Sequence, residues 1–141
     1  MKSFFDTSVL LASFLDGHQH YQRSFDVLAD ANRKNSCCAA HSLAELYATL
    51  TRLPGRSGLS VEQALWSLDS VAERLELISL EPIEYRHAIR EAGHNRVMGG
   101  TIYDALLGQC ALKAHATTIY TWNVTHFRML GSDIAEKVRT P

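Results

Sequence analysis

Four side chains with oxygen ligands stand far apart in the sequence, and together they would have a definite chemistry. They are Asp6, Glu45, Asp104 and Asn123. Two unit charges ~4 Å apart repel by roughly 4 kcal/mol at an effective dielectric constant of about 20, so carboxylates gathered in one cleft require protons or a cation. Hard oxygen ligands suit Mg²⁺ or Mn²⁺, which proteins hold through one or two carboxylates together with waters and substrate phosphate. The chemistry that follows is metal-assisted hydrolysis of a phosphodiester bond.

Short apolar strands alternating with helices are the elements that must bring these residues together. Runs of β-branched and aromatic residues predict strands, whereas apolar residues at helical spacing predict helices. The alternation predicts βαβ units and a parallel sheet covered by helices on both faces, which is the α/β fold class. The expected strands cover 2–5, 36–40, 75–80 and 117–122, the expected helices cover 9–15, 21–33, 41–53, 60–71, 82 to before 99 and 101–115, and 134–138 is either an edge strand or a helical turn.

The predicted sheet places these polar residues near one rim. Open parallel sheets carry their ligand sites beyond the carboxyl ends of the strands. Asp6 follows the first strand, Glu45 lies in the first turn of the helix after the second strand, and Asn123 follows the strand TTIYTW. Asp104 lies in the first turn of the helix that follows Gly99–Gly100, without a strand immediately before it. We expect all four to converge, although the strand-end rule does not itself place Asp104.

Each acid taken alone has an ordinary structural explanation. Ser42–Glu45 and Thr101–Asp104 match the capping box, in which an acid reaches back to the amide that begins the helix. Ser60–Gln63 matches the same pattern although no candidate catalytic residue is expected near it. Asp6, with two hydroxyl residues after it, fits a turn or a helix cap. A single acid therefore favours a structural role, and only the joint placement of all three favours catalysis.

Length and composition indicate one globular domain spanning residues 1–141. The net charge of −1 is not the strongly basic balance of a protein that holds nucleic acid by charge alone, yet it allows a few local phosphate contacts. Asp6 and Asp16 bound the first apolar run, so we expect no signal peptide and no membrane span, and we predict a cytoplasmic protein. The three cysteines, Cys37, Cys38 and Cys110, have no metal-binding spacing, and we expect buried, reduced thiols.

Four segments together resemble a known family. They are FFDTSVLLASF, HSLAELYATLTRLP, TIYDALL and TWNVTHF, and their order and spacing across the chain are similar to those of the PIN-domain ribonucleases, in particular the VapC-type toxins of bacterial toxin–antitoxin pairs. The resemblance implies a three-layer α/β/α domain around a central, mainly parallel sheet. It also implies an acidic cluster that holds Mg²⁺ or Mn²⁺ and cuts RNA, which would make the chain a metal-dependent endoribonuclease.

The resemblance assigns roles to individual residues. Asp6 and Asp104 look like the main metal ligands, and Glu45 looks like the third acid. Asn123 stands where related domains often carry a fourth acid. Its amide carbonyl can accept a hydrogen bond but brings no negative charge. We therefore expect one firmly bound ion, with any second ion arriving alongside the RNA phosphate.

The resemblance also implies partners. They are an RNA substrate, a cognate VapB-type antitoxin laid in an apolar groove, a second copy of the chain in a homodimer, and DNA only indirectly through the antitoxin complex, with no membrane contact. An ordinary solvated or structural role is the simpler explanation for the two arginines and the histidine among the candidate substrate contacts. These candidate contacts are Thr7, Ser8, Arg52, Arg56 and His126.

Two other functional hypotheses stay open on the sequence alone. One is a catalytically weak module of the same fold, in which Asn123 marks a lost metal site and the chain acts mainly through its antitoxin complex on DNA. The other is a phosphotransferase of the haloacid dehalogenase kind, with Asp6 as the nucleophile. The segment FFDTS lacks the second Asp that this kind of enzyme carries two residues on, so we rank the phosphotransferase last.

Overall fold

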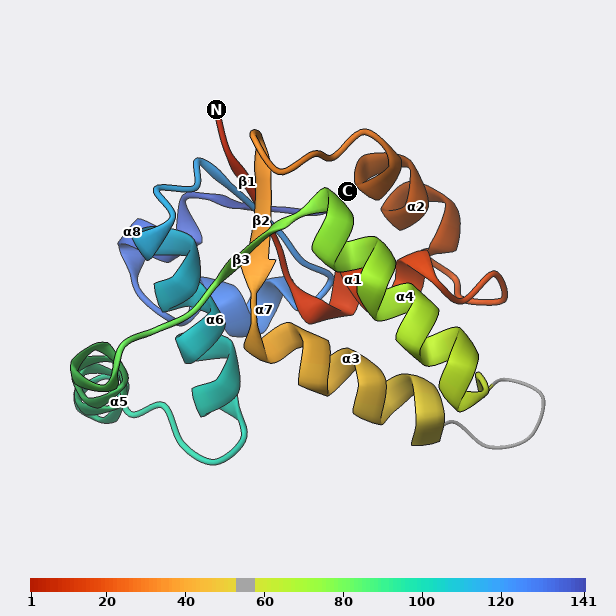
Figure 1. The fold of residues 1–141 in the computed structure, drawn as a ribbon. Helices are drawn as coiled ribbons and strands as arrows, with labels where there is room; N and C mark the ends of the chain where they lie inside the picture. Colours follow the sequence, from red (N-terminus) through yellow and green to blue (C-terminus); the bar gives the residue numbers. More distant parts are fainter. Residues whose placement is uncertain (53–57) are drawn as a thin grey trace.

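Five short parallel strands form the centre of the molecule, for which the computed structural model describes residues 1–52 and 58–141 (Figure 1). The strand order is β3-β2-β1-β4-β5, and every neighbouring pair is parallel. The predicted strands are confirmed, each somewhat shorter than expected. Their bounds are β1 Ser3–Phe5, β2 Ser36–Ala39, β3 Glu76–Ile78, β4 Thr118–Tyr120 and β5 Val138–Arg139.

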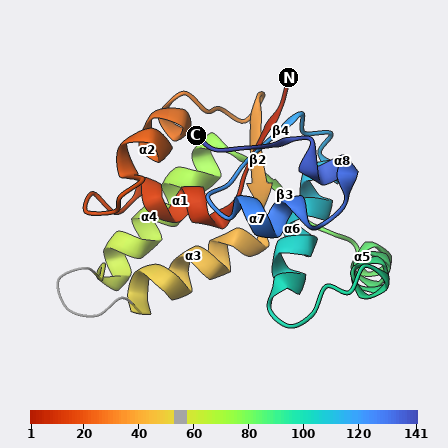
Figure 2. The ribbon, with the colours of Figure 1, turned by 180° about the vertical axis from the view of Figure 1, so that it is seen from behind.

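Helices cover both faces of this sheet, which gives the expected three-layer α/β/α architecture. One layer contains α1 to α4 and the other contains α5 to α8, as the two opposite views show (Figures 1 and 2). The bounds are α1 Thr7–Ser13, α2 Tyr21–Ala29, α3 His41–Arg52, α4 Val61–Arg74, α5 Pro82–His94, α6 Thr101–Lys113, α7 Val124–Arg128 and α8 Ser132–Ala135.

Adjacent strand residues supply the two cores. Successive side chains of a strand point to opposite faces, so a strand buried on both faces is apolar throughout. Phe4 and Cys37 join the core beneath α5–α8, whereas Phe5 and Cys38 join the core beneath α1–α4. All three cysteines are buried and free, as expected. Burial raises the pKa of Cys37 and Cys38 to about 12 and that of Cys110 to about 11.

The helix starts differ from the sequence patterns in an informative way. Ser60 and Gln63 do form the capping box of α4. The box proposed at Thr101 is wrong, because Gly100 is the N-cap residue of α6 and no side chain caps it. The box proposed at Ser42 is also wrong, because α3 begins at His41 and Ser42 already lies within the helix. Glu45 and Asp104 are therefore not committed to capping their own helices.

The carboxyl-terminal region contains more structure than expected. Residues 132–135 form a helical turn and residues 138–139 form an edge strand, so both alternatives for this region are present. Helix α7 was not predicted. No helix in the described ranges is long and apolar enough to cross a membrane.

Candidate active site

The order of the strands reverses between β1 and β4. The chain runs from β1 to β2 and β3 on one side, and then returns to place β4 on the other side of β1. Ligand sites of open parallel sheets lie outside the carboxyl ends of the strands at such a point. The amide of Asp6 donates to the carbonyl of Tyr120 at 3.0 Å, which holds the ends of β1 and β4 together there.

Asp6 is a buried carboxylate held by hydroxyl groups. Its side chain is 1% exposed, and its Oδ2 accepts hydrogen bonds from Ser8 Oγ at 2.6 Å and Thr121 Oγ1 at 2.7 Å. It also serves as the N-cap residue of α1 and accepts from the amide of Ser8 at 3.4 Å. Burial raises the pKa of Asp6, and the two hydroxyls partly oppose that rise. The predicted turn-or-cap role and a place in the site thus coexist in this residue.

Thr121 is a site residue that the sequence analysis missed. It is fully buried, donates to Asp6 and accepts from the amide of Asn123 at 2.9 Å. Ser8 Oγ accepts from the amide of Trp122 at 3.0 Å, which adds a second link between the two strand ends. Thr121 follows β4 by one residue just as Asp6 follows β1, but the predicted strand extended to residue 122 and so concealed that parallel.

Glu45 carries a buried oxygen that has no hydrogen-bond donor among residues 1–52 and 58–141. Its side chain is 35% exposed, yet Oε1 is buried and accepts no hydrogen bond within the described part of the chain. His41 Nε2 lies 3.6 Å from this oxygen. Burial raises the pKa of Glu45, His41 opposes the rise, and the charges of Asp6 and Asp104 add to it.

Asp104 completes the group of acids from a third part of the chain. Its side chain is 21% exposed, and Oδ2 lies 3.3 Å from Nδ1 of the exposed His126. Burial raises the pKa of Asp104, the charge of Asp6 raises it further, and His126 lowers it. The charge of Asp6 therefore reaches both Glu45 and Asp104, which places these three acids near one another at this edge of the sheet.

The donor set of this rim suits a divalent cation. Burial raises the pKa of all three carboxyl groups, and the charge of Asp6 raises those of Glu45 and Asp104 further, so a positive charge between them would stabilise their ionised forms. Among residues 1–52 and 58–141, no three His, Cys, Asp or Glu side chains already stand in position to share one ion. Mg²⁺ needs only one or two carboxylates and completes its shell with water and phosphate. The residues present fit such an ion.

The remaining predicted site residues lie at different distances from the three acids. Asn123 is exposed at the N-terminus of α7, and its side chain makes no capping hydrogen bond. Thr7 donates to Ser42 Oγ at 2.9 Å, so its hydroxyl ties α1 to α3. Arg52 is exposed at the last turn of α3, about 10 Å along the helix from Glu45. Arg56 lies outside the described residues.

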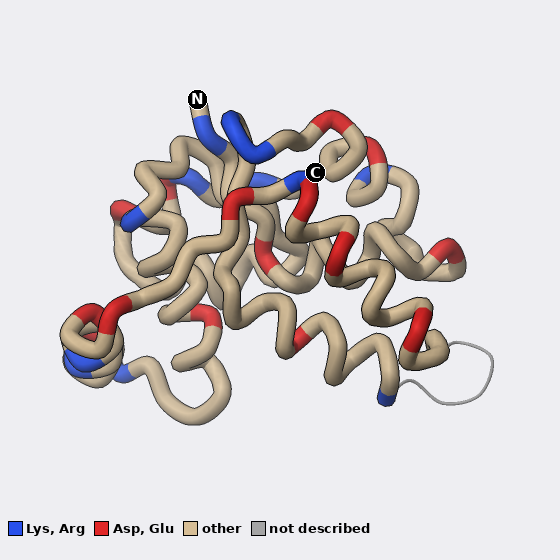
Figure 3. Tube along the Cα trace, in the orientation of Figure 1, with Lys and Arg blue, Asp and Glu red and all other residues tan. Residues whose placement is uncertain are grey.

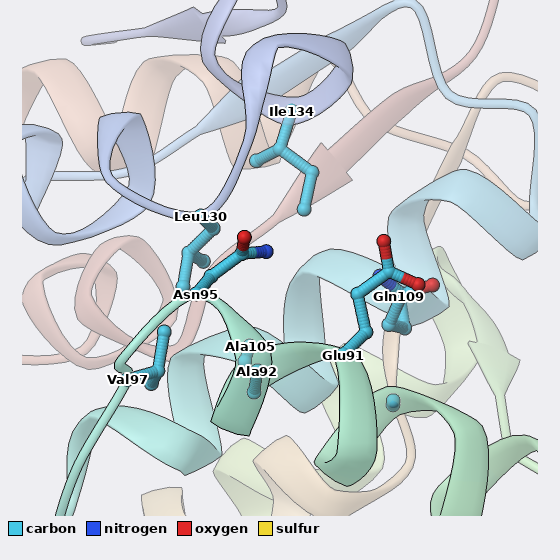
Figure 4. Close-up of a pocket in the computed structure, with 9 residues that line it drawn as sticks. Glu91, Ala92, Asn95, Val97, Ala105, Gln109, Leu130 and Ile134 are labelled. Atoms are coloured by element: carbon cyan, nitrogen blue, oxygen red, sulfur yellow. The ribbon is translucent and has the colours of Figure 1, made fainter.

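A small cavity between α5, α6 and the 130–134 segment is separate from this chemistry. Figure 4 shows Glu91, Asn95 and Gln109 among the residues that line it. None of the three acids lines it, and its volume of about 10 Å³ holds at most one water. It is a packing gap and takes no part in the candidate active site.

Comparison with known proteins identifies the family of the chain. The sequence matches the model of the family described as PIN domain over residues 3–128. The chain belongs to the PIN-domain family. It is 30% identical over 111 residues to ribonuclease VapC40 of Mycobacterium tuberculosis, an alignment that covers 79% of each protein.

Solved structures confirm the fold of this PIN domain. VapC20 of Mycobacterium tuberculosis, described as a sarcin-ricin loop cleaving toxin, superposes with a TM-score of 0.72 at 15% identity over 89% of this chain and 92% of that chain. VapBC2 of Rickettsia felis, bound to a DNA fragment from its promoter, gives a TM-score of 0.67 at 21% identity over 100% and 99%. The resemblance to VapC-type PIN domains is confirmed.

Proposed function

We propose that this PIN domain is a metal-dependent endoribonuclease toxin that hydrolyses RNA phosphodiester bonds at Asp6, Glu45 and Asp104. The observation that supports the proposal is the grouping of three acids at the switch point of the sheet: burial raises the pKa of each, and the charge of Asp6 raises the pKa values of Glu45 and Asp104 further. A site that strains three carboxylates in this way is suited to a cation. The similarity to ribonuclease VapC40, together with the fold shared with VapC20, a sarcin-ricin loop cleaving toxin, supports the choice of RNA.

The residues around the three acids would have different roles in hydrolysis. A bound Mg²⁺ or Mn²⁺ would act as a Lewis acid and lower the pKa of a coordinated water. Asp6 and Asp104 are the proposed main ligands, and Glu45 offers as a third ligand its Oε1, which accepts no hydrogen bond in the part of the chain that the structure describes. Ser8 and Thr121 hold Asp6 in one orientation through their hydroxyls. Asn123 presents a neutral amide that can orient water or substrate without adding charge.

We also infer regulation by a partner protein. The proposed assemblies are a complex with a cognate VapB-type antitoxin and a homodimer of this chain. Contact with DNA is proposed only through the antitoxin complex. The VapBC2 structure, a toxin–antitoxin pair on promoter DNA, supports this by analogy of fold. Leu65 and Trp66 leave an apolar surface exposed on α4, which suits an amphipathic partner segment.

Figure 3 shows acidic and basic residues scattered over the chain, in keeping with its small net charge.

Cleavage by the purified, antitoxin-free chain tests the proposal. RNA should be cut with Mg²⁺ or Mn²⁺ and left intact with EDTA. Asp104→Asn should lower the cleavage rate at least roughly a hundredfold, the scale of losing a group that stabilises the transition state, while circular dichroism shows an unchanged fold. Asp69→Asn, at an exposed acid on α4, is the matched control and should cut like the wild type. Undiminished cutting by folded Asp104→Asn would contradict the assignment.

One observation favours a second candidate, the catalytically weak module. Among the described residues no three ligand-type side chains are yet positioned around one point, and Asn123 adds no charge there. Such a module would fail to bind Mg²⁺ or Mn²⁺ at millimolar concentration and would leave RNA intact. Metal titration, described at the end of the Discussion, separates the two candidates.

A further inference from the structure

Two stacked aromatic rings come from the helices that carry Glu45 and Asp104, and one of them, His41, lies 3.6 Å from Glu45. His41 is the first residue of α3 and Tyr103 lies in the first turn of α6. Their ring centroids are 5.9 Å apart and their planes differ by 10°, so the rings are nearly parallel and offset. His41 lies one helical turn before Glu45, and Tyr103 is the neighbour of Asp104. Each ring is thus fixed to a helix that also carries one of the acids.

Packing of the fold does not account for this pair. Among the helices, α3 packs chiefly on α1 and α4, and α6 packs chiefly on α5 and α7. Figure 1 shows α3 and α6 on either side of the carboxyl end of β2. The side chain of His41 is 41% exposed, and Tyr103 is 52% exposed. A large aromatic residue kept in water at the rim of a site retains ring surface that a ligand can cover.

We propose that Tyr103, backed by His41, is a stacking platform for the base of a nucleotide next to the scissile phosphate. This inference rests on the proposed RNA-cleaving function. A phosphate held at the acids brings its own base, attached through one ribose, to the rim where the rings lie. Every nucleobase has a flat π face that stacks on an aromatic side chain. A further parallel ring extends the offset stack that His41 and Tyr103 already form.

The platform specifies a class of substrate. Bases within a duplex are already stacked on their neighbours, whereas bases in loops, bulges and single strands can be splayed onto aromatic side chains. The site therefore takes RNA in which the nucleotide beside the cut is unpaired. Stacking alone tolerates any base, so Tyr103 strengthens binding without fixing a sequence.

Steady-state cleavage and binding measurements test the platform. The substrate is a short single-stranded RNA containing one bond that the wild type cuts, and binding is measured by fluorescence anisotropy in an Asp6→Asn background. Tyr103→Ala should raise KM and Kd about tenfold with kcat changed less than about twofold, on the scale of one lost base–aromatic stack. Tyr103→Phe keeps the ring and should match the wild type. Phe25→Ala, at an exposed aromatic on α2, is the control and should leave KM unchanged.

A modified RNA tests the same contact without any substitution at Tyr103, on the Asp6→Asn protein whose fold is first checked by circular dichroism. Removing the base next to the cut should weaken binding to the otherwise unchanged Asp6→Asn protein as much as Tyr103→Ala does, and the two losses should not add. Additive losses, equal losses in Tyr103→Phe and Tyr103→Ala, or a KM within twofold of wild type in Tyr103→Ala would each overturn the platform. If the wild type cuts RNA and Tyr103→Ala changes neither KM nor Kd, the stacking platform is refuted while the proposed ribonuclease function stands. A wild type that cuts no RNA removes the proposed function, and the platform with it.

Discussion

The charge of Asp6 is sustained in a buried position by hydroxyl groups. Within the described residues its hydrogen-bond donors are the hydroxyl and the backbone amide of Ser8 and the hydroxyl of Thr121, with no cationic side chain among them. Hydrogen bonds to a carboxylate favour its ionised form, while burial disfavours it. Because burial is the larger influence, the pKa of Asp6 stays above its ordinary value. The carboxylate is therefore well placed to accept a cation and poorly stabilised without one.

Thr121→Val removes one of these hydroxyls while keeping the shape of the side chain. We expect the free energy of unfolding to fall by about 1–3 kcal/mol, because a buried carboxylate loses a donor. Cleavage should weaken with it, since Asp6 loses one of its fixed contacts. Thr121→Ser restores the hydroxyl and should recover most of both quantities. Urea unfolding measures the stability. Thr125→Val, at an exposed threonine on α7, is the control, and a Thr121→Val protein as stable and active as this control would count against the role of Thr121.

Glu45 gives a pH-dependent prediction. Its pKa in the folded state is raised by burial and by Asp6 and Asp104, so the folded protein binds this proton more tightly than the unfolded chain does. Ionised Glu45 therefore lowers stability, and the penalty appears as pH rises from the unfolded pKa of about 4.3 through the higher folded pKa. In EDTA at neutral pH, Glu45→Gln should need more urea to unfold than the wild type.

The advantage of Glu45→Gln should shrink as the pH is lowered towards roughly 4, where the wild-type carboxyl is protonated in both states. Urea midpoints measured across this range check the sign. An advantage that grows with acidity, or a variant that is less stable throughout in the absence of metal, would show that the carboxylate is stabilised by the fold instead.

Strands and helices were predictable to the extent that their signals are local. The runs SCCAA and TTIYTW and the helix started by Ser60 are encoded within a few residues, and the structure has them. Helix starts at Ser42 and Thr101 were misjudged because the capping pattern does not determine which residue begins a helix. Thr121 was missed because its hydrogen bond to Asp6 joins residues 115 positions apart. Such a contact depends on the pairing of β1 with β4, which no local pattern contains.

Burial of the central strands predicts the behaviour of the cysteines. Thiolate is the reactive form of cysteine, and burial raises the pKa of Cys37 and Cys38 to about 12. Iodoacetamide at about pH 8 should therefore leave the folded protein unmodified and should add three groups once urea unfolds it. Mass spectrometry counts the additions. Rapid alkylation of the native protein at Cys37 or Cys38 would show that β2 opens to solvent.

The acidic rim belongs to the molecule as a whole. Asp6 follows β1, Glu45 lies on α3 and Asp104 lies on α6, and helices of both outer layers contribute. The strand-end rule predicted Asp6 and Glu45 from the alternation of elements. The position of Asp104 followed from the family resemblance, because α6 starts after a loop and not after a strand. Only the assembled fold shows that the charge of Asp6 raises the pKa values of both other acids.

Calorimetric titration of the antitoxin-free chain with Mn²⁺ tests the central claim, that these acids share one cation. We predict a single site on the wild type and on Asp69→Asn, and no measurable site on folded Asp104→Asn. Bound ion should also raise the thermal midpoint of the wild type, since a ligand that binds only the folded state stabilises it by about 2.7 kcal/mol at a hundred times its Kd. No binding to the wild type, or equal binding to Asp104→Asn, would contradict the account.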